Sequence, residues 1–288
     1  MKKLGLFALL ISVASTSFAA TKAPLTLKVY NADGNSFHVN STLVYGEKEA
    51  VVIDAGFTKA DAMHIAANVF DSGKKLTTIF VSQADPDYYF GASTLKAIFP
   101  EAKVITTPAV RAAIKKKMAA KLAYWGPKMK ENAPKSLLLP DAYTQDTLLV
   151  DGHEIQIKES TGLLAHRPYL WIPAVKAVLG NVGIYGDLHV WTADVQQTNI
   201  WQQWLKQLNG MAALQPEIVV PGHMAQGTAL DASTITYTQQ YLTEFSNAKK
   251  LSKNSEELAN KMRVAYPDAQ LPIALAIGSK VHMGEMKW

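Results

Sequence analysis

The sequence predicts one α/β domain built as a four-layer αββα sandwich, in which two β-sheets pack face to face between outer helices. Two observations lead to this prediction. Short apolar runs with the two-residue period of strands alternate along the chain with longer segments that carry the helical period. Each half of the chain also runs from strands into helices, without low-complexity segments or repeats at solenoid spacing.

The first half of the chain is predicted to form one sheet with its covering helices. Turn residues separate the apolar runs, and a capped helix should follow the third of them. The predicted strands are 25–30, 37–45, 50–53, 76–81 and 103–106, and the predicted helices are 59–70, 89–99 and 111–125. The last of these helices carries one apolar stripe that ends at Trp125, opposite a basic face. Gly126 and Pro127 are expected to end it.

The second half repeats this organisation. A hairpin is predicted over 147–157, with Asp151 and Gly152 in its turn. Further strands are predicted at 169–172, 177–181 and 217–220, and further helices around 201–211, 234–250 and 255–266. The first of these helices places two tryptophans and three aliphatic side chains on one face, which should bury it against the second sheet.

The N-terminal segment has the pattern of a secretory signal peptide. Lys2 and Lys3 precede an apolar run at 4–13, which is too short to span a bilayer, and small residues at Ser17 and Ala19 suit a signal peptidase. We therefore expect cleavage after Ala19, export to the periplasm or the medium, and one mature domain over residues 20–288 without a membrane span.

Composition limits the partners and the chemistry. The chain contains no cysteine, which excludes a lipid-modified cysteine, disulfides and thiolate ligands or nucleophiles. The formal net charge of +5 includes Lys2 and Lys3, so the mature chain carries only a mild positive excess. Such an excess does not predict nucleic-acid binding. A small molecule is the expected partner.

Polar segments directly follow predicted buried strands at four places. These are residues 54–56, 82–88, 181 and 221–223. Functional sites of α/β folds gather at such strand ends. In their order and spacing the four motifs resemble the metallo-β-lactamase superfamily over about residues 37–224, with the helices of 230–288 following. The resemblance implies the αββα fold of that superfamily and an ancestral site in which two zinc ions activate a water molecule.

The residues at the metal-ligand positions depart from the family pattern. The resemblance aligns 82–88 with the motif Thr-His-x-His-x-Asp-His, so Gln83, Asp85 and Tyr88 stand at histidine positions, and Asp87 alone keeps the family residue. The third ligand segment places a leucine, Leu163, where the family has a histidine.

Of the last two ligand positions, one departs from the family residue and the other keeps it. Asn181 stands where the family has the carboxylate that bridges the metals, and His223 keeps the final histidine. The remaining donors are mostly oxygens with one imidazole. This set argues against a normal dizinc centre and suits a harder divalent ion better than zinc. The candidate ligands of one such ion are Asp85, Asp87 and His223, and a site without metal remains open.

Two functions are consistent with this interpretation. The first is an exported hydrolase-like protein with an atypical, non-dizinc site, acting on a lactone, ester or phosphoester, in which Asp85, Asp87 and His223 are catalytic. The predicted substrate-binding residues are Gln83, Tyr88, Asn181 and His189. The alternative is a non-catalytic periplasmic protein of the same fold that binds a small molecule. A metal-free acid–base pair of Asp85 and His223 is a third possibility.

Other roles compete for several of these residues. Asp85 or Asp87 could cap the helix that follows, since a carboxylate accepts backbone N–H groups there. His166 or His189 could replace a missing imidazole, because each follows a degenerate motif within a few residues. Trp125, at the end of its helix, is expected near the mouth of the pocket.

Overall fold

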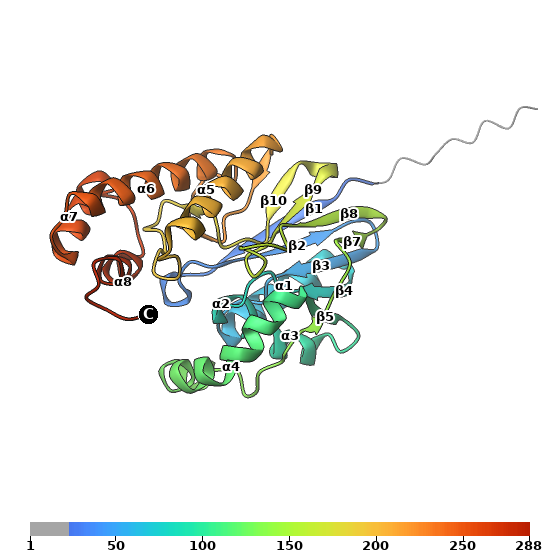
Figure 1. The fold of residues 1–288 in the computed structure, drawn as a ribbon. Coiled ribbons are helices and arrows are strands. Elements are labelled where there is room, and N and C mark those ends of the chain that lie inside the picture. Colours follow the sequence, from blue (N-terminus) through green and yellow to red (C-terminus); the bar gives the residue numbers. More distant parts are fainter. Residues whose placement is uncertain (1–22) are drawn as a thin grey trace, which may run out of the picture.

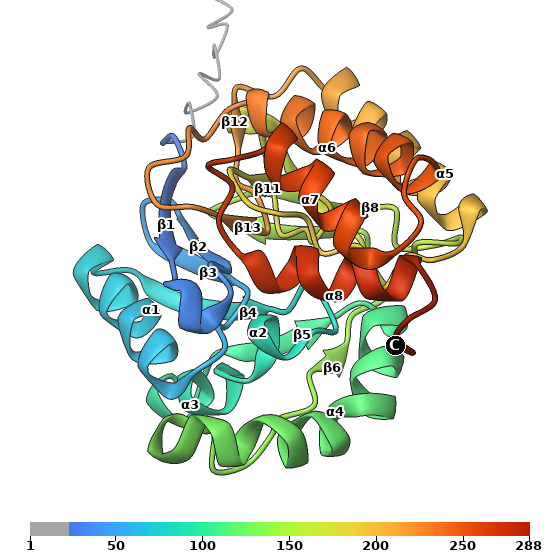
Figure 2. The same ribbon diagram turned by 90° about the vertical axis from the view of Figure 1, so that its left-hand side faces the viewer.

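Two sheets lie face to face between two layers of helices in the computed structural model of the chain, which describes residues 23–288 (Figures 1 and 2). This arrangement confirms the predicted αββα sandwich. Helices α1 to α4 cover one side of the pair of sheets, and α5 to α8 cover the other. The expected signal peptide and its cleavage site lie outside the described residues.

The first sheet is mixed, with its strands in the order in which they follow along the chain. Strands β1 to β3 pair antiparallel, and β3 to β6 pair parallel. Their bounds are β1 Thr26–Asn31, β2 Asn40–Tyr45, β3 Glu49–Ile53, β4 Lys75–Phe80, β5 Lys103–Thr106 and β6 Asp141–Ala142. Residues 50–53 of β3 are all buried, because helices cover one face of this strand and the second sheet covers the other.

The helices on the first sheet are α1 Lys59–Ser72, α2 Pro86–Tyr89, α3 Ala92–Ile98 and α4 Pro108–Met129. A capping box of Thr58 and Asp61 starts α1, and Gly73 ends it with a positive φ of 66°. The single helix predicted over 89–99 is wrong, because the chain breaks at Gly91. A Cβ there would lie 2.0 Å from the carbonyl oxygen of Ala55, so only glycine permits this approach of the two segments.

Helix α4 is longer than predicted. The expectation that Gly126 and Pro127 end the helix is wrong, since Pro127 lies inside it. Trp125 and Met129, on either side of this proline, both pack against the core of the first sheet. These contacts hold the last turn although proline removes one backbone donor.

The second sheet has the strand order β12-β10-β9-β8-β7, and β11 and β13 form a separate parallel pair. The bounds are β7 Thr147–Val150, β8 His153–Lys158, β9 Tyr169–Ile172, β10 Ala177–Leu179, β11 Tyr185–Gly186, β12 Ile218–Val219 and β13 His223–Met224. Short 3-10 turns occupy Gly34–Ser36, Lys130–Asn132 and Pro173–Val175. The chain around Gly34–Ser36 delays the second predicted strand, which starts at Asn40 and not at residue 37.

The helices on the second sheet are α5 Thr198–Ala213, α6 Ser233–Lys250, α7 Ser255–Ala265 and α8 Pro272–His282. The sequence predicted α5, α6 and α7 but not α8. Helix α8 starts with a proline in its first turn and packs against α7 (Figure 2). No helix in the part of the chain that the structure describes is both long and apolar enough to cross a bilayer.

The buried side chains form separate layers that match the sandwich. Aliphatic and aromatic residues of both sheets, including Val51, Phe80, Ile155 and Leu170, fill the space between the sheets. One further cluster lies between the first sheet and α1, α3 and α4, and another lies between the second sheet and α5 to α8. This packing fixes the loops at one end of the strands, where the polar motifs gather.

Candidate functional site

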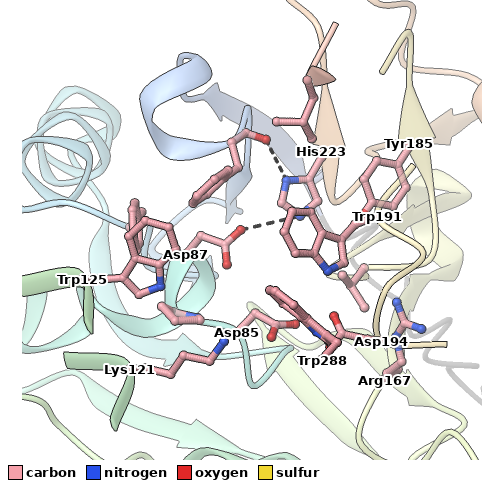
Figure 3. Close-up of a pocket in the computed structure, with 15 residues that line it drawn as sticks. Asp85, Asp87, Lys121, Trp125, Arg167, Tyr185, Trp191, Asp194, His223 and Trp288 are labelled. Atoms are coloured by element: carbon pink, nitrogen blue, oxygen red, sulfur yellow. Dashed lines mark hydrogen bonds and ion pairs between the residues drawn. The ribbon is translucent and has the colours of Figure 1, made fainter. Parts of the chain in front are cut away.

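A pocket opens where the two halves of the sandwich meet at the strand ends (Figure 3). Its volume is about 660 Å³ when the space at its open mouth is included. Six aromatic side chains line it, namely Phe37, Phe57, Trp125, Tyr185, Trp191 and Trp288. Six ionisable side chains also line it, namely Asp85, Asp87, Lys121, Arg167, Asp194 and His223. The expectation that Trp125 lies at the pocket agrees with this lining.

Asp54 anchors the loop that carries the main motif. The backbone N–H and the hydroxyl of Ser82 donate hydrogen bonds to the two carboxyl oxygens of Asp54, each at 2.7 Å. Asp54 is buried, and burial raises the pKa of its carboxyl group to about 7 against the opposing effect of these hydrogen bonds. The loop therefore leaves β4 in a fixed direction and delivers α2 to the floor of the pocket.

Asp85 and Asp87 both turn into the pocket, between Trp125 on one side and Trp191 on the other (Figure 3). Asp85 occupies the N-cap position of α2, but its side chain accepts no capping hydrogen bond, so the capping alternative is wrong for Asp85. Burial, followed by the charge of Asp194, raises the pKa of Asp85. Burial, followed by the charge of Asp85, raises the pKa of Asp87 well above its usual value.

His223 faces Asp87 across the floor of the pocket. Its Nδ1 lies 2.9 Å from the carbonyl oxygen of Phe37, and since a carbonyl can only accept, Nδ1 carries the hydrogen. Its Nε2 lies 3.6 Å from Oδ2 of Asp87. Burial lowers the pKa of His223 to about 4, so the ring is neutral at pH 7. The acid that faces His223 in this structure is thus Asp87, while the Asp85–His223 pair stays a prediction.

Gln83 and Tyr88 lie beneath the pocket and do not line it. Gln83 is 1% exposed, and its Nε2 donates to the carbonyl oxygen of Pro168 at 2.9 Å. The fully buried hydroxyl of Tyr88 donates to the carbonyl oxygen of Asn181 at 3.1 Å, and its ring packs edge-on against His223. In this structure Gln83 and Tyr88 position loops under the site, and their contact with a substrate stays a prediction.

Asn181 is also a structural residue in this geometry. Its Nδ2 donates to the carbonyl oxygen of Val220 at 3.1 Å, and its Oδ1 accepts from the backbone N–H of Ile184 at 2.9 Å. Both ends of the amide are used, and the side chain is not part of the pocket wall. A Cβ on Gly222 would lie 2.1 Å from the carbonyl oxygen of Asn181, so these loops are packed without spare room. The predicted contact of Asn181 with a substrate stays a prediction, and the structure gives the side chain a role in holding these loops.

The two candidate replacement histidines do not reach the pocket. His189 is buried beside Tyr241, whose hydroxyl lies 3.1 Å from its Nδ1, and burial lowers its pKa to about 4. His166 is exposed and lies outside the pocket lining. His189 therefore packs within the helical layer over the second sheet, outside the pocket lining, and its role in substrate binding stays a prediction.

The sequence of the chain matches a known protein family over most of its length. The family model of the metallo-beta-lactamase superfamily matches residues 34–223. The chain belongs to this superfamily. This finding confirms the resemblance drawn from the four strand-end motifs.

Solved structures of the metallo-β-lactamase superfamily share the fold. A metallo-beta-lactamase family protein from Thermus thermophilus is similar over 90% of this chain and 91% of its own, with a TM-score of 0.61 and 15% identity. A metallo-beta-lactamase from Pontibacter korlensis is similar over 79% of this chain and 97% of its own, with a TM-score of 0.51 and 15% identity. At this identity the likeness extends to the fold alone. A search of curated proteins finds no match.

The residues present do not fit the dizinc centre of the metallo-β-lactamase superfamily. Asn181 uses its amide internally, Leu163 is 56% exposed and has no donor atom, and the hydroxyl of Tyr88 is committed to a backbone carbonyl. Asp85, Asp87 and His223 line one pocket, but within residues 23–288 no three acidic or histidine side chains are arranged to hold a metal ion. These residues therefore do not support a mechanism through a zinc-bound water.

Sequence reasoning missed several pocket residues. The guanidinium of Arg167 lies 4.8 Å from the ring centre of Trp204, and its buried Nη1 has no hydrogen-bond partner in the described structure. Trp288 packs against Trp191 at 5.3 Å and donates from Nε1 to Oδ1 of Asp194 at 2.7 Å. Arg167 lies four residues after Leu163 but matches no family residue, and Trp288 lies far from every motif, so no local signal in the sequence identified them.

Proposed function

We propose that this protein is a member of the metallo-β-lactamase superfamily that binds a small organic molecule in the aromatic pocket and does not depend on a dizinc centre. One observation carries the proposal. The side chain at the position of the bridging carboxylate, Asn181, has both polar ends bound to backbone groups of neighbouring loops. Asn181, at the position of the family's bridging carboxylate, thus holds neighbouring loops together, while the pocket above it remains open at its mouth.

The lining of the pocket suits an organic ligand. Trp125, Trp191 and Trp288 offer ring faces and edges that bury apolar surface, and Asp85 and Asp87 supply polar atoms at the floor. Apolar walls with a few converging polar groups are typical of small-molecule sites. Water without a metal ion is a poor nucleophile at neutral pH, which favours binding over hydrolysis as the main function.

A screen of chelator-treated protein tests this function. Differential scanning fluorimetry against a library of small organic fragments should find compounds that raise the melting temperature by several degrees, since saturation at about 100 times Kd adds roughly 2.7 kcal/mol. Trp191→Ala should abolish these shifts, and Trp201→Ala, on a helix outside the pocket, serves as the matched tryptophan control. Metal-dependent turnover of lactones, esters or phosphoesters, with no fragment bound, would contradict the proposal.

Metal-independent hydrolysis is the second candidate, because one geometric feature favours it. The hydrogen bond from Nδ1 of His223 to Phe37 directs the free Nε2 toward the pocket beside Asp87. In that position Nε2 can accept a proton from water that attacks a bound ester or lactone. Slow hydrolysis that persists in chelator and disappears in His223→Gln would support this candidate; hydrolysis that persists in that variant would eliminate it.

We also propose that the protein works in the periplasm or outside the cell. The support is the sequence pattern of Lys2, Lys3, the apolar run at 4–13 and the small residues up to Ala19. Cell fractionation followed by N-terminal sequencing should recover a mature chain that begins at Ala20. Recovery of the intact N-terminus from the cytoplasmic fraction would contradict this location.

A further inference from the structure

With Asp85 and Asp87 ionised, the polar groups at the floor of the pocket are hydrogen-bond acceptors. Nε2 of His223 and Oδ2 of Asp87 face each other at 3.6 Å, too far for a direct hydrogen bond, and Nδ1 of His223 already holds the hydrogen of that ring. Asp85, two residues before Asp87, lines the same pocket and lies between Asp87 and Trp288 in the view of Figure 3. Within residues 23–288 the carboxyl group of Asp85 receives no hydrogen bond, and that of Asp87 accepts one only from its own backbone N–H. The floor therefore lacks a donor that reaches all three groups.

Two of these acceptors are nearly closed off from solvent, and Asp85 is half-buried. Asp87 is 7% exposed and His223 is 6% exposed, and both face the pocket. A buried acceptor without a donor is costly, so a ligand that supplies N–H groups would gain more here than at an open surface.

The walls above this floor favour a cation. Trp125 stands on one side, and Trp191 and Trp288 stand on the other (Figure 3). Tryptophan faces attract positive charge, most strongly where water is excluded. An ammonium group of the chain already lies near this wall, since Nζ of Lys121 is 5.9 Å from the ring centre of Trp288.

The two cationic side chains that line the pocket, Arg167 and Lys121, do not pair with the carboxyl groups at its floor. Arg167 stacks on Trp204, and Lys121 extends from α4 with its amino group turned toward Asp85 (Figure 3). Neither forms an ion pair with Asp85 or Asp87 in the described part of the chain. The three carboxyl groups of the lining outnumber these two cations.

We propose that the pocket binds a protonated primary amine attached to a flat apolar group, with its three ammonium N–H groups directed at Asp85, Asp87 and His223 and the apolar group between the tryptophans. This inference deepens the proposed function and rests on it. A metal ion satisfies acceptors as well, but tryptophan rings offer it no ligand atoms, and the described residues contain no metal-binding group of three.

Calorimetric titration of the purified, chelator-treated protein tests the inference with matched probes. Phenethylammonium is the positive probe. The controls of similar size are 2-phenylethanol, which is neutral; phenylacetate, which is an anion; and trimethylphenethylammonium, which carries charge but no N–H. Phenethylammonium should bind at least about tenfold more tightly than each control, because charge-assisted hydrogen bonds and cation–π contacts act together.

Two variants with opposite expected signs separate this mode from general packing. Asp87→Asn should weaken phenethylammonium binding by about 10- to 100-fold, as expected for losing a hydrogen bond to a charged group. Lys121→Met should strengthen it by about threefold, because it removes a competing positive charge while keeping the apolar stem. The matched controls are Asp71→Asn and Lys116→Met, which change exposed charges outside the pocket and should leave the affinity unchanged.

The possible outcomes distinguish failure of this inference from failure of the proposed function on which it rests. Selective, N–H-dependent binding that Asp87→Asn weakens and Lys121→Met strengthens supports the inference. Equal or tighter binding of phenylacetate, 2-phenylethanol or the trimethylated probe would overturn it and leave small-molecule binding intact. Absence of binding by every organic probe, together with stoichiometric binding of zinc chloride, would overturn the inference and the proposed function together.

Discussion

Asn181→Asp is the most informative single substitution, because it restores the acidic residue of the superfamily at the bridging position. In this chain the amide of Asn181 donates to the carbonyl oxygen of Val220 and accepts from the N–H of Ile184. An ionised carboxylate keeps the second bond but faces the Val220 oxygen with another acceptor. Leaving that carbonyl unpaired costs about 1–3 kcal/mol. Burying the new charge adds to this cost, and we expect a total loss of about 3 kcal/mol at neutral pH.

The loss of stability in Asn181→Asp should grow as the pH rises. Burial should raise the pKa of the introduced carboxyl group, and the protonated form can again donate to Val220. Stability is then retained at low pH and lost as the pH rises through the pKa of the folded state. Urea unfolding at about pH 5 and about pH 8 should show the larger loss at the higher pH. Asn209→Asp, at an exposed helical position, is the matched control and should change stability by less than about 0.5 kcal/mol. Wild-type stability of Asn181→Asp at the higher pH, or strong stabilisation of this variant by zinc, would refute the reasoning.

Three further predictions concern stability and the release of ligand. Gly222→Ala should destabilise the protein by about 3 kcal/mol or more in urea unfolding, because the new Cβ would lie 2.1 Å from the Asn181 carbonyl oxygen and 2.5 Å from the Tyr88 hydroxyl; an unchanged midpoint would show that these loops can separate. Trp288→Ala should leave the unfolding midpoint nearly unchanged, since this side chain is 52% exposed, but it should speed ligand dissociation measured by stopped-flow fluorescence; an unaltered dissociation rate would remove Trp288 from the pocket wall. Burial lowers the pKa of His189 to about 4 in the folded state. Between pH 6.5 and 4 this histidine is therefore protonated in the unfolded chain but neutral in the folded chain. The free energy of unfolding thus falls as the pH falls through this window. His189→Gln should therefore lose less stability than the wild type over this window in thermal unfolding scans, and an equal loss would assign the effect to other groups.

The fold was predictable because periodicity and turn chemistry agree along most of the chain. The apolar runs and strand-end motifs place both sheets and most of the helices. The errors fall where tertiary contacts override local signals. Pro127 continues α4 since flanking side chains pack on the core, and α8 was missed because its short apolar run, Pro272–His282, carries no clear polar face.

The site was predictable only in part. Asp85, Asp87 and His223 follow strands whose ends meet, so their convergence on one pocket follows from the topology. Spacing does not reveal which way a side chain points or which carbonyl it binds, and Gln83 illustrates this limit by turning to a backbone carbonyl beneath the pocket. Trp288 joins the pocket from a distant segment, through a contact that only the packed tertiary structure creates.

Metal content measured with ligand binding tests the central claim most directly. The purified protein, dialysed against zinc and then freed of loosely bound ions, should contain well under one zinc ion per chain by plasma mass spectrometry. Its affinity for phenethylammonium should be the same with and without chelator. Two tightly held zinc ions per chain, released only on unfolding and required for any ligand or substrate to bind, would contradict the account.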